Sequence, residues 1–165
     1  MLKREDHPFG PIYDESSRIL ILGSFPSVKS REESFFYGHP QNRFWKVIKS
    51  VTGYRGEIQT IEEKTKMLIE HHIALWDTIA SCDIEGSSDS SIRNAIANDL
   101  SEIIKTGKIS TIFCNGNTSY KLYKKYSERV TGIPAKVLPS TSPANASWSL
   151  EKLIEKWKEE ISLFI

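Results

Sequence analysis

Polar side chains gather in four short loops, each of which directly follows an apolar run. The loops comprise residues 23–26, 76–77, 115–117 and 139–143, and most of their residues are Gly, Pro, Ser, Thr or Asn. Side-chain hydroxyls and amides, together with the main-chain N–H groups of such turns, bind phosphates and the edges of bases. We therefore expect the chemistry of the protein in these four loops.

The first loop continues into a segment that could hold a flat ligand. Gly23 directly follows a buried run, where the missing side chain lets a ligand or another backbone approach closely. Tyr37 offers a planar surface on which a base could stack, worth roughly 1–3 kcal/mol per base. Asn42 stands where a helix should begin, just before Arg43, and taken alone it is typical of an N-cap residue.

The last loop, Val137-Leu-Pro-Ser-Thr-Ser-Pro-Ala-Asn-Ala146, is dense in hydroxyl side chains and proline. It could hold phosphates through its hydroxyls and main-chain N–H groups, or it could be a rigid connector into the final helix. The pattern by itself favours neither interpretation.

The elements that position these loops alternate between strands and helices. Strands are expected at residues 18–23, 72–77, 109–114 and 135–138, and the first of them is continuously apolar, as in a parallel strand covered on both faces. Helical spacing covers residues 42–51, 60–71, 91–105 (as two stretches meeting near 98–99), 118–130 and the segment from 149. This order predicts a parallel sheet with helices on both faces and a site at the carboxyl ends of its strands. We expect one domain, residues 1–165.

Composition argues against several classes of protein. The formal net charge is only +1, so DNA binding would have to rest on local contacts and not on an overall basic field. The local clusters are typical of solvated surfaces; they are Lys29 with Arg31, Arg43 with Lys46 and Lys49, and Lys121 with Lys124 and Lys125. A charged start and the lack of an apolar run of about 20 residues predict a cytoplasmic protein, nucleoid-associated in a prokaryote, without a membrane partner.

Neither the cysteines nor the histidines show metal-ligand spacing. Cys82 and Cys114 stand far apart, each at or near the end of an apolar run, and we interpret them as small buried thiols. The pair His71 and His72 is interpreted as a helix end.

Three segments together resemble a known family. They are Gly23-Ser-Phe-Pro26, Phe36-Tyr-Gly-His-Pro-Gln-Asn-Arg-Phe-Trp-Lys46 and Leu138-Pro-Ser-Thr-Ser-Pro-Ala-Asn-Ala146. They resemble the two signature motifs of the uracil-DNA glycosylase superfamily, most closely those of its hypoxanthine-DNA glycosylase branch, also called deoxyinosine glycosylases. The first two segments are also similar to mismatch-specific uracil-DNA and thymine-DNA glycosylases. The resemblance runs from about residue 19 to residue 146, and residues 76–91 add a further stretch similar to the hypoxanthine branch.

The resemblance implies a fold, a reaction and a substrate. The fold would be a three-layer α/β/α sandwich with a four-stranded parallel sheet in the order 2-1-3-4. The reaction would be hydrolysis of the N-glycosidic bond of a flipped, deaminated base, most simply hypoxanthine, in double-stranded DNA. No metal or organic cofactor would be required, and the protein would act as a monomer.

One position departs from the wider superfamily. Its first motif usually has Asp or Asn just before the proline, and that side chain handles the attacking water; here the position is Phe25. The resemblance to the hypoxanthine branch implies that this task passes to Asn42. Because an amide is a poor general base, we expect Asn42 to position the water and not to deprotonate it fully.

The resemblance also implies roles for the other loop residues. The base pocket would be formed by Gly23, Ser24, Phe25, Pro26, Tyr37, Asp77 and Asn115. The DNA-binding residues would be Ser27, Ser140, Thr141, Ser142, Pro143, Ala144 and Asn145. Among these, Tyr37 would stack on the base, Asp77 could accept from a ring N–H, and the serines and threonine near 140 would grip flanking phosphates.

Three alternatives remain open at this stage. The substrate could be uracil or several deaminated bases, as in uracil or mismatch-specific glycosylases. The protein could be a catalytically weak module that only binds DNA lesions. An unrelated α/β phosphate-binding enzyme is a poor match, because the first loop lacks both the P-loop Lys-Ser/Thr and the GxGxxG pattern.

Overall fold

A four-stranded parallel sheet forms the centre of the molecule in a computed structural model that describes residues 1–106 and 108–165. Its strands, in spatial order, are β3 (Ile73–Asp77), β2 (Ile19–Gly23), β6 (Thr111–Asn115) and β7 (Ala135–Leu138). All neighbouring pairs are parallel. The structure thus confirms the four predicted strands and their order, 2-1-3-4.

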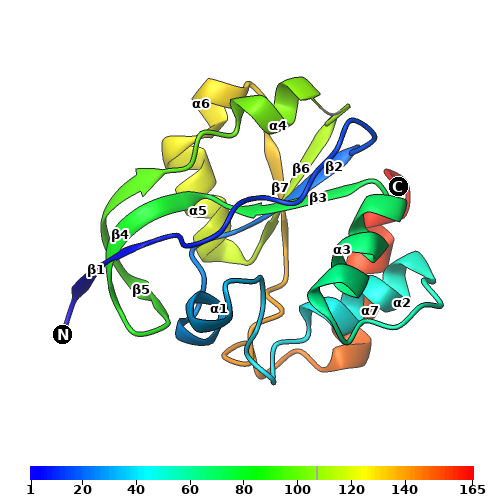
Figure 1. Cartoon of the computed structure of the whole chain (residues 1–165), viewed down its shortest axis with the longest axis horizontal. Coiled ribbons are helices and arrows are strands. Elements are labelled where there is room, and N and C mark those ends of the chain that lie inside the picture. Colours follow the sequence, from blue (N-terminus) through cyan, green and yellow to red (C-terminus); the bar gives the residue numbers. More distant parts are fainter. Residues whose placement is uncertain (107) are drawn as a thin grey trace.

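The central strand β2 explains why helices cover both faces of this sheet (Figure 1). Ile19 and Ile21 face a core with α2 (Phe44–Thr52), α3 (Ile61–Glu70) and α7 (Leu150–Ile161). Leu20 and Leu22 face a second core with α4 (Ser101–Thr106) and α5 (Asn117–Tyr126), beside which lies α6 (Glu128–Thr131). Successive strand residues point to opposite faces, so an all-apolar strand must be covered on both. The three-layer prediction is confirmed.

Helix ends and one buried helix face explain several local features, and the interpretation of His71 as a helix end is confirmed. Thr60 and Glu63 form a reciprocal capping box at the start of α3. The apolar stripe of α7 is buried at Leu153, Trp157 and Ile161, and His71 is the C-cap residue of α3. The helix predicted over residues 118–130 is interrupted at Ser127, which separates α5 from α6.

The helix predicted over residues 91–97 is wrong, because this segment is a strand. β5 (Ser88–Ala97) pairs with β4 (Ile79–Glu85), which also pairs with β1 (Lys3–Asp6), in a three-stranded antiparallel sheet of order β1-β4-β5. Ile92, Ala95 and Ile96 have helical spacing, but pairing with β4 and the tight turn at Gly86, where φ is +57°, favour the hairpin. The second predicted stretch is confirmed as α4.

The antiparallel sheet has its own small core and lies next to the carboxyl end of β3. Phe25 packs there against Ile79, Cys82 and Ile84, with Ile92, Ala95, Leu122 and Tyr126 at the edge of the cluster. A single residue, Thr78, separates the last residue of β3 from the first of β4. The hairpin β4–β5 therefore stands beside the edge where the predicted site lies.

α1 (Val28–Glu33) begins just after the first loop and is capped by Ser27. Among the described residues, none of the helices combines the length and the apolar character that a membrane crossing needs.

The cysteines provide a test of this packing. Cys82 and Cys114 are free and fully buried, and burial raises the pKa of their thiols to about 11 and about 12 respectively. Because the thiolate is the reactive form, we expect neither cysteine to react with an aromatic disulfide reagent at pH 8 in the folded protein. Both should react in denaturant. Rapid labelling of either thiol without denaturant would contradict the burial.

Candidate active site

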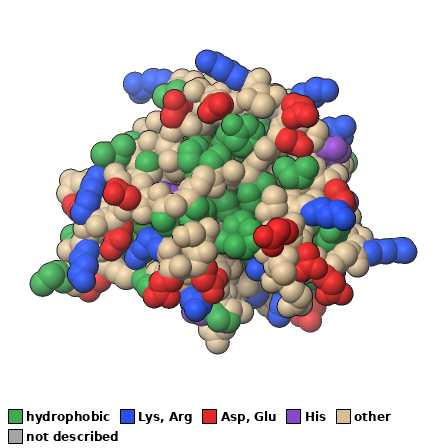
Figure 2. Space-filling view, viewed as in Figure 1, with side chains coloured by type: hydrophobic (Ala, Val, Ile, Leu, Met, Phe, Trp, Pro, Cys, Tyr) green, Lys and Arg blue, Asp and Glu red, His purple; other side chains and the backbone are tan. Residues whose placement is uncertain are grey.

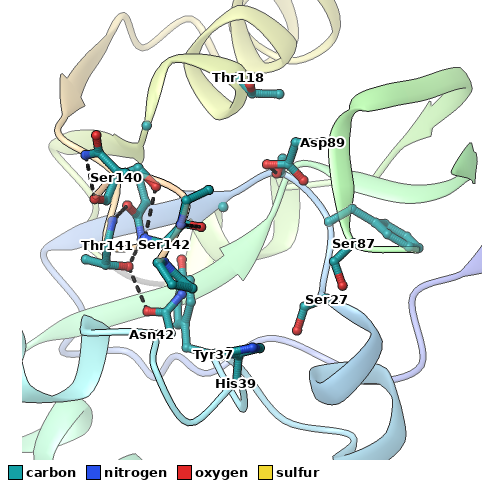
Figure 3. A pocket seen from close by; sticks show the side chains of 18 of the residues that line it. Ser27, Tyr37, His39, Asn42, Ser87, Asp89, Thr118, Ser140, Thr141 and Ser142 are labelled. Atoms are coloured by element: carbon teal, nitrogen blue, oxygen red, sulfur yellow. Dashed lines mark hydrogen bonds between the residues drawn. The ribbon is translucent and has the colours of Figure 1, made fainter. Parts of the chain in front are cut away.

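A cleft of about 850 Å³ opens at the carboxyl edge of the parallel sheet. The loops that follow β2, β3, β6 and β7 line it, together with the tip of the β4–β5 hairpin. Every site residue expected from the sequence, from both the pocket set and the DNA-binding set, lies in the lining of this one cleft. Figure 3 shows Asn42 and residues 140–142 on one side of it and Asp89, Ser87 and Ser27 on the other.

Asn42 is joined to the loops after β6 and β7 by a chain of hydrogen bonds (Figure 3). Asn115 and Thr141 form a two-way pair, in which the Asn115 amide donates to the Thr141 hydroxyl over 3.0 Å and the Thr141 main-chain N–H donates to Asn115 Oδ1 over 3.0 Å. The Thr141 hydroxyl in turn donates to Asn42 Oδ1 over 2.9 Å.

The same oxygen of Asn42 also accepts from the main-chain N–H of Phe44, the first residue of α2, over 2.9 Å. Both lone pairs of Oδ1 are therefore used, and a flipped amide would set an N–H against the Phe44 N–H. The N-cap residue of α2 is Arg43 and not Asn42, but the Asn42 side chain still accepts from the first N–H of the helix. Asn42 is left with only its Nδ2 hydrogens for a ligand or water. In this orientation Asn42 can donate but cannot accept a proton.

Arg43 ties the two motifs together through main-chain carbonyls. Its guanidinium donates to Ser142 O over 2.8 Å and to Asn145 O over 3.2 Å, and it also donates to Trp148 O. Its main-chain N–H donates to Thr141 O over 3.1 Å. The side chain is thus half-buried, and its guanidinium is bound to main-chain carbonyls of the protein itself. It fixes the loop of residues 139–148, which we call the distal loop.

Thr141 differs from the phosphate contact expected from the sequence. It is fully buried, and its hydroxyl is engaged with Asn42 and Asn115, so it has no free donor for a phosphate. The hydroxyls of Ser140 and Ser142 lie nearer the surface and accept from the N–H groups of Ser142 and Ala144 within the distal loop. Ala144 itself is exposed at the tip of this loop.

Asp77 ends β3 and lies beside Gly23, its register partner at the end of β2. A Cβ on residue 23 would come within 2.4 Å of Asp77 Oδ1, so the missing side chain makes room for this carboxylate. Asp77 Oδ2 is 2.8 Å from Nε2 of His7, and the two side chains are only 6% and 3% exposed. Sequence reasoning missed His7, which stands alone outside every motif and reaches the site only through the fold.

Tyr37 is held in an unusual backbone conformation, with φ of +53°, which disfavours any side chain bulkier than glycine. One face of its ring stacks on Phe44, with ring centroids 4.1 Å apart. Its hydroxyl oxygen is buried beside the Asn115 side chain, and it makes no well-formed hydrogen bond among the described residues. Burial and the nearby Asp77 carboxylate raise the pKa of this hydroxyl, which therefore remains protonated and able to donate.

Asp89 is a second carboxylate that sequence reasoning missed, although it stands in the segment that resembles the hypoxanthine branch. It projects from β5 into the cleft, where the Ser24 hydroxyl donates to its Oδ2 over 2.6 Å. Burial raises the pKa of the Asp89 carboxyl, and the hydrogen bond from Ser24 acts in the opposite direction. The signal available in the sequence was a single acidic residue within a run of serines.

Phe25 is only 6% exposed and packs in the core of the antiparallel sheet, with the Arg31 guanidinium 5.5 Å from the centroid of its ring. Arg31 also donates to Pro26 O over 2.8 Å and to Gly86 O over 3.2 Å. This arginine therefore anchors the first loop to the hairpin, as Arg43 anchors the distal loop.

Comparisons with known proteins agree with this architecture. The family model described as the uracil DNA glycosylase superfamily matches residues 11–162. A hypoxanthine DNA glycosylase of Methanosarcina acetivorans is 37% identical over 150 residues, which cover 90% of this chain and 92% of the relative. A protein of the same name from Methanosarcina barkeri is 33% identical over 153 residues, covering 92% of this chain and 94% of the relative.

A solved structure shows the same likeness in three dimensions. The solution NMR structure of a candidate uracil DNA glycosylase from Methanosarcina acetivorans superposes with a TM-score of 0.79 at 35% identity, covering 97% of this chain and 96% of that one. With a family model that spans nearly the whole chain, these matches show that the protein belongs to the uracil DNA glycosylase superfamily.

Proposed function

We propose that the protein is a monofunctional DNA glycosylase that hydrolyses the N-glycosidic bond of hypoxanthine in double-stranded DNA. The observation that carries this proposal is the single cleft in which both motifs meet, with Asn42 held at its wall by Thr141. The names of the Methanosarcina relatives support hypoxanthine as the base. We further propose that it acts as a monomer in the cytoplasm, on nucleoid DNA, because one chain supplies every residue of the cleft.

The target nucleotide must leave the duplex before it can enter this cleft. Extruding a base costs a few kcal/mol, and least where it is mispaired, as hypoxanthine is opposite thymine. Ala144 at the exposed tip of the distal loop is placed to fill the vacated position, and the hydroxyls of Ser140 and Ser142 with main-chain N–H groups would hold flanking phosphates. On the face shown in Figure 2, basic side chains lie scattered among acidic ones, so local contacts must provide the grip.

Bond cleavage follows from the way Asn42 is held. As the C1′–N9 bond breaks, its electron pair goes to the base and the sugar becomes cationic. A water whose oxygen accepts from Asn42 Nδ2 keeps a second lone pair free to form the new bond to C1′. The proton that this water loses passes to solvent, and the departing base anion takes up a proton from solvent. Such a cation needs a well-placed water more than a strong base, so a donor-only amide suffices. The main-chain N–H groups of Ser24 and Phe25 are candidates for stabilising the departing base.

Phe25 is compatible with this assignment. The ring of Phe25 packs among Ile79, Cys82 and Ile84 and anchors the first loop. Asn42, just before α2, positions the water instead. The carboxyl group of Asp89 lies across the cleft from Asn42, and in its ionised form it would favour a cationic sugar.

Substrate choice is the first prediction. In duplexes carrying hypoxanthine, uracil or xanthine opposite each normal base, we expect the fastest base release from hypoxanthine, measured as alkali-labile strand breaks. Release of uracil alone would instead indicate the uracil or mismatch-specific type. Binding to the lesion duplexes without release of any base would indicate a lesion-binding module.

The variant Asn42→Ala tests whether Asn42 positions the attacking water. Loss of a positioned nucleophile should lower single-turnover base release by about a hundred-fold or more. Loss of the bonds from Phe44 and Thr141 should lower the free energy of unfolding by about 1–3 kcal/mol. Gln41→Ala, an exposed neighbour outside the cleft, is the matched control and should keep the wild-type rate. A wild-type rate in Asn42→Ala would rule out this role.

Thr141→Val tests the link that orients Asn42. Valine keeps the shape but removes the donor to Asn42 and the acceptor for Asn115, leaving buried groups unpaired at a cost of about 1–3 kcal/mol. We expect lower stability in a denaturant titration and at least ten-fold slower base release. Thr141→Ser keeps the hydroxyl and should recover most of both. Equal base release by the valine and serine variants would show that the link does not orient Asn42.

A further inference from the structure

Three side chains converge where Gly23 lacks a Cβ. That position lies 2.4 Å from Asp77 Oδ1 and 3.1 Å from the Tyr37 hydroxyl oxygen, and the other carboxylate oxygen of Asp77 is bound to His7. Gly23, Tyr37 and Asp77 all line the cleft. The wall of the cleft thus holds two buried polar atoms around this one position, contributed by different segments of the chain.

The hydrogen bonds of His7 fix the role of Asp77. The main-chain N–H of Phe9 donates to His7 Nδ1 over 3.4 Å, so Nδ1 is an acceptor and the ring hydrogen lies on Nε2. Nε2 therefore donates to Asp77 Oδ2 over 2.8 Å. Aromatic rings of Phe9, Phe25, Phe36 and Trp76 surround the imidazole and hold it in place. Asp77 is left with Oδ1 as an acceptor beside Gly23.

The Tyr37 hydroxyl supplies the opposite function. It is buried beside Asn115 without a well-formed hydrogen bond among the described residues, and such groups are uncommon in protein interiors because they are costly. It lies next to an acceptor-only carboxylate and remains protonated. A ligand that brings an acceptor to Tyr37 and a donor to Asp77 would satisfy both atoms at once.

We propose that Asp77 and the Tyr37 hydroxyl form an acceptor–donor pair that reads the lactam edge created by deamination, with His7 as the residue that positions Asp77. Hypoxanthine carries N1–H and C6=O side by side, which match Asp77 and Tyr37 respectively. Adenine, its parent base, has a lone pair at N1 and an amino group at C6, the reverse pattern. The glycosidic bond tethers the base, so it cannot shift to exchange the two positions.

The pair defines a substrate class and not one base. Uracil and xanthine carry the same N–H and C=O arrangement, whereas cytosine carries the reverse. Guanine carries the same N1–H and C6=O groups, so the protein must reject guanine through other contacts. This inference rests on the proposed function and assigns Tyr37 a polar role in addition to, or in place of, the stacking surface expected from the sequence.

Tyr37→Phe separates these roles, because phenylalanine keeps the ring and its stacking on Phe44. We expect single-turnover release of hypoxanthine to fall about ten- to a hundred-fold through loss of one buried hydrogen bond to the base. Affinity for a duplex with an abasic site, which offers no base edge, should stay within about two-fold of wild type. Tyr120→Phe, the same change outside the cleft, is the matched control and should leave both values unchanged.

Asp77→Asn tests the acceptor. His7 would hold the amide oxygen, so the amide nitrogen would meet the N1–H of the base, donor against donor. Release should fall by about a hundred-fold or more, again with abasic-site affinity kept. Asp6→Asn, an exposed residue next to His7 in the chain, controls for the loss of one negative charge.

His7→Phe removes the donor to Asp77 and keeps an aromatic ring, whereas His7→Gln keeps an N–H. We expect the first to slow release at least ten-fold and the second to recover much of it. Because His7 acts through Asp77, the double variant His7→Phe with Asp77→Asn should be no slower than Asp77→Asn alone. Additive losses would show that His7 influences release independently of Asp77 and would rule out its positioning role.

Wild-type rates in both Tyr37→Phe and Asp77→Asn, or loss of abasic-site affinity in step with the rate, would overturn the inference and leave the proposed function standing. If the wild-type protein releases none of hypoxanthine, uracil and xanthine, the proposed function itself fails. Thermal melting of each variant, within a few degrees of wild type, confirms that folded proteins are being compared.

Discussion

The hydrogen bonds between the start of α2 and the distal loop hold the cleft in shape. They join Asn42 to Thr141 and Arg43 to the carbonyls of Ser142 and Asn145, about a hundred residues further along the chain. Each partner is a buried or half-buried polar group that would be costly to leave unpaired. One set of bonds therefore satisfies the N-terminus of a helix, closes a loop and fixes the direction of the amide that meets the water.

This constraint also limits the chemistry available to the site. An amide whose oxygen is occupied twice can only donate, so Asn42 can locate a water but cannot remove its proton. A dissociative reaction with a cationic sugar tolerates that limit, because the cation attracts even a weak nucleophile. Fixed geometry contributes more here than basicity would.

The antiparallel sheet adds a wall that the parallel sheet alone would lack. Its strand β4 follows β3 almost directly, so the hairpin stands beside the carboxyl edge and brings Asp89 opposite Asn42 and the distal loop (Figure 3). The segment just after β1 brings His7 against Asp77. Phe25 and Arg31 lock the first loop onto this sheet. The two sheets thus hold opposite sides of one cleft.

The sequence by itself determined the parallel sheet, its strand order and the loops that carry the site. Continuous apolar strands such as residues 19–22 can be stable only when covered on both faces, and parallel strands must present their carboxyl ends at one edge. The motifs around Asn42 and Thr141 could therefore be assigned to one site from the sequence alone. The strand at residues 88–97 could not be predicted from the sequence, because its apolar spacing also suits a helix. Only its pairing with β4 decides between strand and helix.

Side-chain roles within the site were decided by tertiary structure. Thr141, expected at a phosphate, is buried as a link to Asn42, and Arg43, expected on the surface, binds carbonyls. His7 belongs to no motif, and Asp89 stands in the stretch of residues 76–91. They meet Asp77 and Ser24, respectively, only because distant segments pack together. Hydrogen bonds between residues far apart in the chain produce no periodic pattern in the sequence. Residue type and spacing can locate a site, but only the fold decides which atom faces the substrate.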